Sequence, residues 1–195
     1  ALTCKEKNPR FAYLAPTFKQ AKSIAWDYMK QFTDKIPNTK FNETELRVDL
    51  PNGARITLLG SDSPDGLRGI YLDGCVIDEY ANVNSRLFPE VIRPALSDRK
   101  GYCVFIGTPA GMNNNFYELY QHANGADDWF NYKAKASDTK IVDEDELVKA
   151  KEVMGEKKYN QEFECDWIAN IEGAVYGDVV GEMDDSNKLT RVPYD

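Results

Sequence analysis

The sequence contains no Gly-Lys pair, one histidine and four cysteines. A phosphate-binding P-loop needs Gly-Lys followed by Ser or Thr, so the lysine and the amides of such a loop are missing from this chain. The cysteines are widely separated, none forms a Cys-x-x-C pair, and His122 is the one histidine. A zinc site or a Ser-His-Asp triad therefore has little support. Cys75 and Cys103 lie in apolar runs, which is typical of buried thiols in a reducing compartment.

Long apolar runs and an excess of basic charge are missing as well. No stretch approaches the roughly 20 apolar residues of a membrane span, and no signal-peptide pattern opens the sequence, so neither a membrane association nor secretion is expected. Basic residues number 24 against 32 acidic ones, which gives a net charge of −8. Proteins that hold DNA over a broad face are normally basic, so any contact with nucleic acid is expected to be local or to belong to a part outside this chain.

Short apolar runs alternate with amphipathic stretches, and this pattern predicts an α/β fold with a mainly parallel sheet flanked by helices. Residues 11–15 are predicted to form a buried strand and to be followed by a helix. Thr17 and Gln20 fit a capping box at the start of this helix. Its apolar residues recur at helical spacing, namely Phe18, Ala21, Ala25, Tyr28 and Phe32.

The next segments predict a β-hairpin and a second buried strand. Residues 46–50 and 55–59 flank Asn52-Gly53, a pair that readily forms a tight turn. The apolar region 70–77 predicts a strand that ends at Asp78-Glu79, and 87–92 predicts a short helix that Pro94 should end or kink.

Another continuous apolar strand is predicted at residues 102–106. A helix capped within 113–115 and a strand at 129–132 should follow it. From Asp143 onward the sequence predicts two helices divided at Gly155, a small helical appendage.

The strongest chemical signal is the apolar run 75–77 that ends in two acids. Because ligands of parallel sheets bind beyond the carboxyl ends of the strands, this pattern has the form of a Walker B element. Asp78 could then hold Mg²⁺ and Glu79 could orient a water and accept its proton. The alternative is a strand that simply reaches the surface at a loop.

Two further motifs are weaker. In 105–111 an apolar strand ends at Gly107, which permits close backbone approach, and Thr108, which can bridge to a phosphate or its attacking water. The alternative is a strand-to-turn junction stopped by proline. Arg68 lies between glycines and can reach a phosphate or a neighbouring subunit's nucleotide, or it can be a solvated residue of a turn.

Taken together, these motifs resemble the ATPase part of the tailed-phage terminase large subunit. The segments that carry the resemblance, in chain order, are Leu67-Arg68-Gly69, Val76-Ile77-Asp78-Glu79-Tyr80, Ile92-Arg93-Pro94-Ala95-Leu96 and Ile106-Gly107-Thr108-Pro109-Ala110-Gly111. Residues 14–21 resemble the family's strand-helix segment after its P-loop helix, and 159–165 resemble the segment after its ATPase core.

The resemblance implies a P-loop ATPase fold of the additional-strand class and a motor that pumps viral DNA into a procapsid. Asp78 would be the Mg²⁺ carboxylate, Glu79 the catalytic base, and Thr108 part of the coupling motif, with Gly107 beside the nucleotide and Arg68 as a phosphate sensor or finger. ATP and Mg²⁺ would be the cofactors of the intact protein. Its partners would be double-stranded DNA, the procapsid portal and the terminase small subunit, in a homo-oligomeric ring in the host-cell cytoplasm.

The departures from the family pattern lead to further expectations. Without a Gly-Lys loop, residues 1–136 are expected to be an ATPase core that lacks its N-terminal P-loop unit. Residues 137–170 are expected to be a helical linker subdomain and 171–195 the lead-in to an absent nuclease domain. The acids of this last segment, Glu182, Asp184 and Asp185, fit a solvated loop better than a nuclease site. Alone, this chain is expected to bind no nucleotide, hydrolyse no ATP and cut no DNA.

Two other functions stay open at this point. A helicase-like ATPase of the same class would share the Asp78-Glu79 element. A non-enzymatic module with an acidic surface could instead dock a basic partner.

Overall fold

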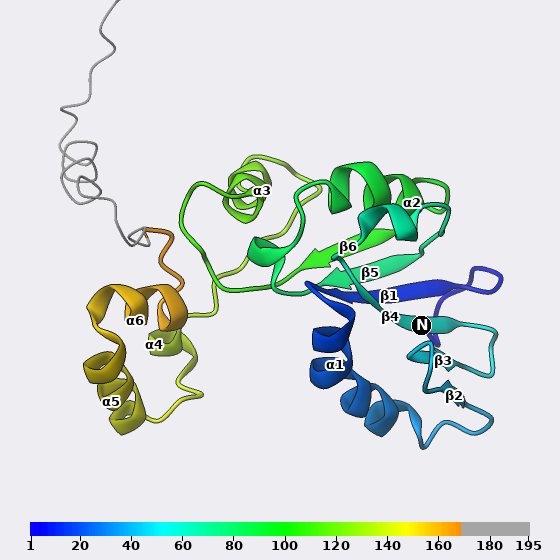
Figure 1. The fold of residues 1–195 in the computed structure, drawn as a ribbon, viewed down its shortest axis with the longest axis horizontal. Coiled ribbons are helices and arrows are strands. Elements are labelled where there is room, and N and C mark those ends of the chain that lie inside the picture. Colours follow the sequence, from blue (N-terminus) through cyan, green and yellow to red (C-terminus); the bar gives the residue numbers. More distant parts are fainter. Residues whose placement is uncertain (169–195) are drawn as a thin grey trace, which may run out of the picture. The chain divides into compact units, whose positions relative to one another are not determined.

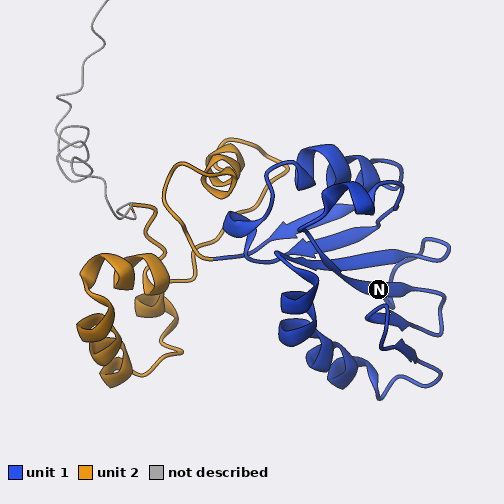
Figure 2. Cartoon of the chain, in the orientation of Figure 1, with its two compact units in different colours: residues 1–107 blue, residues 108–195 orange. Residues whose placement is uncertain are grey.

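The structure, a computed structural model, describes residues 1–168. The chain forms two compact units, one from Ala1 to Gly107 and one that begins at Thr108 (Figure 2). The first unit is built on a six-stranded sheet, and the described part of the second is helical (Figure 1).

The sheet has the strand order β2-β3-β4-β1-β5-β6. Strands β4, β1, β5 and β6 run parallel to one another, whereas β2 and β3 are antiparallel additions at one edge. The predicted α/β fold with a mainly parallel sheet is therefore confirmed. The bounds are β1 Arg10–Ala15, β2 Lys40–Asn42, β3 Arg47–Asp49, β4 Arg55–Gly60, β5 Gly74–Ile77 and β6 Tyr102–Phe105.

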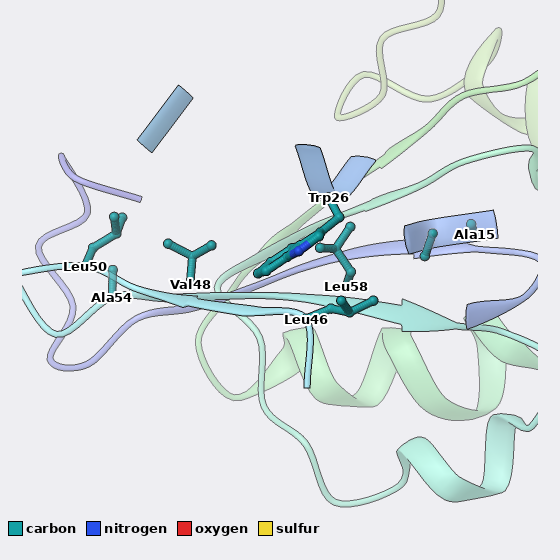
Figure 3. Packing of buried hydrophobic residues seen from close by; sticks show 8 residues of the cluster. Ala15, Trp26, Leu46, Val48, Leu50, Ala54 and Leu58 are labelled. Atoms are coloured by element: carbon teal, nitrogen blue, oxygen red, sulfur yellow. The ribbon is translucent and has the colours of Figure 1, made fainter. Parts of the chain in front are cut away.

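Helix α1 (Phe18–Thr33) covers one face of β1 and β4 and carries the largest side chain of this core. Trp26 lies over Leu58 of β4 (Figure 3), and both are buried. The helix is confirmed, but the face suggested by its aromatic spacing is wrong, since Tyr28 is 61% and Phe32 77% exposed. The predicted position Ala21 is buried, and Trp26 takes the place of the predicted aromatic residues, because its bulky indole fills the space above the sheet that the smaller side chains leave.

The predicted hairpin is present as β3 and β4. Val48 pairs with Ile56, and the turn between the strands closes through a 2.8 Å bond from the Leu50 N–H to the Ala54 carbonyl. Gly53 has a φ of +82°, which suits its place in this turn. Strand β2 was not expected, because its three residues are too short and too polar to give a sequence signal.

A helical segment packs on the opposite face of the sheet. It begins as a π-helical turn, η3 (Phe88–Ile92), and continues as α2 (Arg93–Ser97). The ring of Phe88 packs edge-on against Phe105 of β6, with 4.7 Å between ring centroids. Of the two outcomes predicted at Pro94, an end or a kink of the helix, the end is wrong: Pro94 lies where the bonding changes from π to α, in the first turn of α2, and needs no N–H donor there. Residues 70–72 lie outside strand β5.

The second unit contains α3 (Asn115–Ala123), α4 (Ala136–Thr139), α5 (Glu144–Met154) and α6 (Glu156–Phe163). Trp167 is buried against the rings of Phe116, Tyr117 and Tyr120. The helices predicted around Gly155 and after 113–115 are confirmed. The strand predicted at 129–132 is wrong: these residues are irregular, with no neighbouring strand in this unit's described part, and Phe130 is 87% exposed.

The compact units divide between Gly107 and Thr108, whereas the expected functional boundaries at 136–137 and 170–171 remain predictions. The segment 171–195, with Glu182, Asp184 and Asp185, lies outside the described residues. Within residues 1–168, none of the helices has both the length and the apolar character needed to cross a membrane.

Candidate active site

The carboxyl ends of the four parallel strands lie at one edge of the sheet, where ligands of such sheets bind. The loops after the strands are tied to each other by hydrogen bonds. Ser61, which follows β4 and is buried, donates its N–H to the Ala15 carbonyl at 2.9 Å and its hydroxyl to the Pro16 carbonyl at 3.1 Å. These hydrogen bonds hold the loops at this edge in place, and with them the side chains that the loops carry.

Asp78 directly follows β5 at this edge. Its N–H donates to the Leu14 carbonyl at 2.8 Å, which prolongs the pairing of β5 with β1 by one residue. Its carboxylate is half-buried, and each oxygen accepts a hydrogen bond. Oδ1 accepts from the Glu79 N–H at 2.9 Å, and Oδ2 accepts from the hydroxyl of Tyr13. The carboxylate is therefore oriented from two sides.

Tyr13 reaches Asp78 because of the strand register. Tyr13 of β1 pairs with Val76 of β5, and Asp78 is two residues further along, so both side chains leave the same face of the sheet. Burial of the phenol raises the pKa of Tyr13, and the hydrogen bond to the Asp78 carboxylate and the nearby negative charges raise the pKa further. Tyr13 consequently stays protonated and remains a hydrogen-bond donor.

Glu79 has a left-handed backbone conformation, with φ of 49° and ψ of 44°. This conformation is uncommon for a residue with a side chain and costs about 1–2 kcal/mol. It turns the chain sharply into η2 (Tyr80–Asn82), so Glu79 projects from the end of the strand next to Asp78. The Asn82 side-chain amide donates to Oε2 of Glu79 at 3.4 Å.

Gly107 joins the end of β6 to this turn. The Tyr80 N–H donates to the Ile106 carbonyl at 3.0 Å. Gly107 has a φ of +154°, and a Cβ there would meet the Tyr80 nitrogen at 3.1 Å and the Glu79 Cα at 3.3 Å. The close approach predicted for Gly107 therefore exists toward the Asp78-Glu79 turn. Thr108 follows in the chain as the first residue of the second unit.

Comparison with known proteins was made on both sequence and fold. The sequence profile of the family described as "Terminase large subunit, T4likevirus-type, N-terminal" matches residues 1–177. This chain belongs to that family. The resemblance inferred from the order of the motifs is thereby confirmed.

Terminase large subunits of two Thermus viruses, phage G20c and virus P23-45, are each 30% identical over 126 residues. Each match covers 55% of this chain and 26% of the relative, so the aligned region spans about a quarter of the relatives' length. The large terminase ATPase domain of Thermus phage P74-26 has a similar fold, with a TM-score of 0.69 and 21% identity over 83% of this chain and 78% of that one. The large terminase of the thermophilic bacteriophage D6E in complex with ADP also has a similar fold, with a TM-score of 0.67 and 14% identity. This match covers 84% of this chain and 42% of the D6E chain.

Within this terminase chain, Arg68 lies in a separate ion-pair network. It follows η1 (Pro64–Leu67) and donates to Asp65 at 2.9 Å and to Glu90 at 3.1 Å. Arg86 pairs with the same two acids. Hydrogen bonds from Arg68 to Asp65 and from Arg86 to Glu90 lower the pKa of each carboxyl. The guanidinium of Arg68 is half-exposed and is held by residues of its own unit.

The donor chemistry of the terminase site fits a magnesium ion that is shared with a substrate. Mg²⁺ prefers oxygen ligands and is commonly held by one or two carboxylates together with water and substrate phosphates. Asp78 supplies such a carboxylate, whose oxygens still have lone pairs beyond the two that accept hydrogen bonds. Among residues 1–168 no cluster of three or more acids, histidines and cysteines forms a complete metal cage.

Two residues of this terminase site were missed by the sequence analysis. Tyr13 was read as part of a buried strand, and Asn82 lies in a stretch without a pattern. The alternation of β1 could have placed Tyr13 on the face opposite Leu14, but its meeting with Asp78 also requires that β1 pairs with β5. Asn82 carries no sequence signal, because it depends on the turn made by Glu79.

Proposed function

We propose that this chain is a central segment of the ATPase of a terminase large subunit. In the intact protein, ATP hydrolysis would drive viral DNA into a procapsid, and a separate endonuclease domain would cut the DNA. The observation that carries the proposal is the pair Asp78-Glu79, which lies at the carboxyl end of a central parallel strand. The Asp78 N–H donates to the Leu14 carbonyl of β1, and the next residue, Tyr80, donates to the Ile106 carbonyl after β6. Its occurrence in a terminase family member supports this assignment.

Each residue of the candidate site would have its own role in ATP hydrolysis. Asp78 would hold the metal through its oriented carboxylate, and Glu79 would orient the attacking water and accept its proton. When bound, Mg²⁺ supplies charge neutralisation for the phosphates. Gly107 would let the β6 end lie close to the base, and Thr108 would connect hydrolysis to movement.

Nucleotide binding would need residues outside this chain. The sequence has no Gly-Lys pair, so the amides and lysine of the phosphate cradle would come from another part of the intact protein. For this reason the isolated chain would bind no ATP. Arg68 would act as a phosphate sensor or finger after exchanging its present partners, Asp65 and Glu90, for a phosphate.

The wider assembly is proposed on the same basis. Double-stranded DNA, the portal and the small subunit would be the partners of a homo-oligomeric ring that works in the cytoplasm of the host cell. The net charge of −8 supports a motor in which DNA contacts made by this chain are local.

The test compares variants of the intact protein by phosphate release. Glu79→Gln keeps the size of the side chain and removes the base, so hydrolysis should fall by about 10²–10⁴-fold. Glu146→Gln, an exposed change on α5, serves as the matched control and should leave the rate unchanged. Full activity of Glu79→Gln would overturn the proposal.

Two further measurements separate the alternatives. Stimulation of hydrolysis by the portal rather than by a forked duplex favours the packaging motor over a helicase. Phosphate release by the purified 195-residue chain that Glu79→Gln abolishes would contradict the expected inactivity of the chain alone.

A further inference from the structure

One contact at the candidate site has no role in the function described so far. The Tyr13 hydroxyl donates to Oδ2 of Asp78, while the Glu79 N–H donates to Oδ1 at 2.9 Å. Tyr13 comes from β1 and Asp78 from the end of β5, and the two are separated by 65 positions in the sequence. The bond is therefore made by the sheet topology and not by local chain geometry.

The bond restricts the carboxylate of Asp78 in a way that a backbone donor alone would not. One donor on each oxygen fixes the plane of the carboxylate as well as its direction, and both donors belong to paired strands or to the turn that ends one of them. Two of the roughly four lone-pair positions of a carboxylate are then used. The remaining lone-pair positions of the Asp78 carboxylate are available to a metal ion or to its bound water.

We propose that Tyr13 is a positioning residue that holds the Asp78 carboxylate in the orientation required for magnesium binding. The inference rests on the proposed function, because it takes Asp78 as the metal carboxylate. Groups that orient a metal-binding side chain commonly contribute 10–100-fold to metal affinity. The competing role for Tyr13 is purely structural, as a bond that joins β1 to β5.

The experiment measures Mn²⁺, used as a probe for Mg²⁺, by electron paramagnetic resonance in the intact protein with ATP-γ-S. The variants are Tyr13→Phe and Tyr13→Leu, which both remove the hydroxyl, and Asp78→Asn. Tyr102→Phe is the matched control, since Tyr102 is a strand tyrosine of the same sheet that is 59% exposed. Thermal unfolding and the Mg²⁺ dependence of phosphate release are followed in parallel.

Both Tyr13 variants should raise the half-saturating Mn²⁺ concentration by about 10-fold, and Tyr102→Phe should not change it. Excess Mg²⁺ should restore most of the rate of Tyr13→Phe. A lowered unfolding temperature with unchanged Mn²⁺ affinity would overturn the inference in favour of the structural role. If Asp78→Asn loses Mn²⁺ while both Tyr13 variants bind normally, the inference about Tyr13 fails alone. If Asp78→Asn itself binds Mn²⁺ and hydrolyses ATP normally, the proposed function fails, and the inference fails with it.

Discussion

The two units of the chain bury their apolar side chains to very different extents. In the first unit β1, β3, β4 and β5 each contribute buried residues, and Leu14, Leu58 and Ile77 are completely inaccessible. In the described part of the second unit the buried apolar side chains, apart from Pro109, are Ala123, Ala136 and Trp167. Helices α5 and α6 bury none.

This difference shows where the fold obtains its stability. The sheet unit is held by a continuous core of the kind that supports independent folding. The helices α5 and α6 depend on local interactions, such as the Asp143 cap and the Lys158–Glu162 pair at 2.7 Å. Interactions of this type contribute only tenths of a kcal/mol to about 1 kcal/mol each. Asp78, Glu79 and Gly107 lie on the unit that has the core, so their geometry is set by packing.

The sharpest test of this contrast removes one apolar side chain from each unit. Leu58→Ala deletes a fully buried side chain under Trp26 and should lower the free energy of unfolding by about 2–5 kcal/mol. Val153→Ala, on a side chain of α5 that is 86% exposed, should change it by about 0.5 kcal/mol or less. Urea denaturation of the 195-residue chain measures both. If the two variants lost the same free energy of unfolding, α5 would have to be packed as tightly as the sheet.

A medium effect is expected at the start of α3. The Asn114 side chain accepts from the Phe116 and Tyr117 N–H groups at 2.9 and 3.2 Å, which satisfies two free amides of the first turn. Asn114→Ala should destabilise α3 by about 1 kcal/mol, seen as faster amide hydrogen exchange in that helix. The neighbouring Asn113→Ala, at an exposed position, is the control. Faster amide exchange in the sheet as well would show that the two units unfold together, which would contradict the contrast between them.

The smallest effect concerns pH and the β3–β4 edge of the first unit. Burial of Asp49 opposes its ionisation, but the guanidinium groups of Arg55 and Arg47 outweigh this and lower its pKa from the usual 3.8. A lowered folded-state pKa stabilises the protein above the unfolded-state pKa, and this contribution is lost as the pH falls through the folded-state value.

Asp49→Asn should therefore cost about 1 kcal/mol or less at pH 7, and the difference from the parent should shrink below about pH 4. Unfolding curves collected from pH 7 to pH 2 measure this change. Asp98→Asn, an exposed change in the same unit, is the control. If the difference in stability between Asp49→Asn and the parent grew at low pH, the assignment of the ion pairs of Asp49 would be contradicted.

The sequence predicted the sheet unit better than the helical one. The reason is the continuous buried core of the sheet unit, which also makes the two units differ in stability. Continuous apolar runs such as 75–77 are predictive because their side chains must be buried, and Asn52-Gly53 is predictive because few residue pairs form that turn easily. The run 129–132 failed because aromatic residues that favour strands also occur in exposed loops when no neighbouring strand is available.

At the candidate site, the sequence indicated the residues that follow the ends of strands. It did not indicate the residues of other elements that contact them. Asp78, Glu79 and Gly107 could be named because each directly follows an apolar run. The contact of Tyr13 with Asp78 required the strand order and the register of β1 against β5, which no local pattern contains. The ion pair of Arg68 with Glu90 was missed because it depends on the fold, which brings η1 and η3 together.

The left-handed backbone of Glu79 has an evolutionary consequence. A glycine would adopt these angles without strain, so selection for thermal robustness alone would drive this position away from glutamate. On the proposed role of Glu79 as the base, a glutamate at this position is a trade-off between robustness and turnover. Inactive descendants of this protein would be expected to lose the side chain at this position early and to gain stability as they do so.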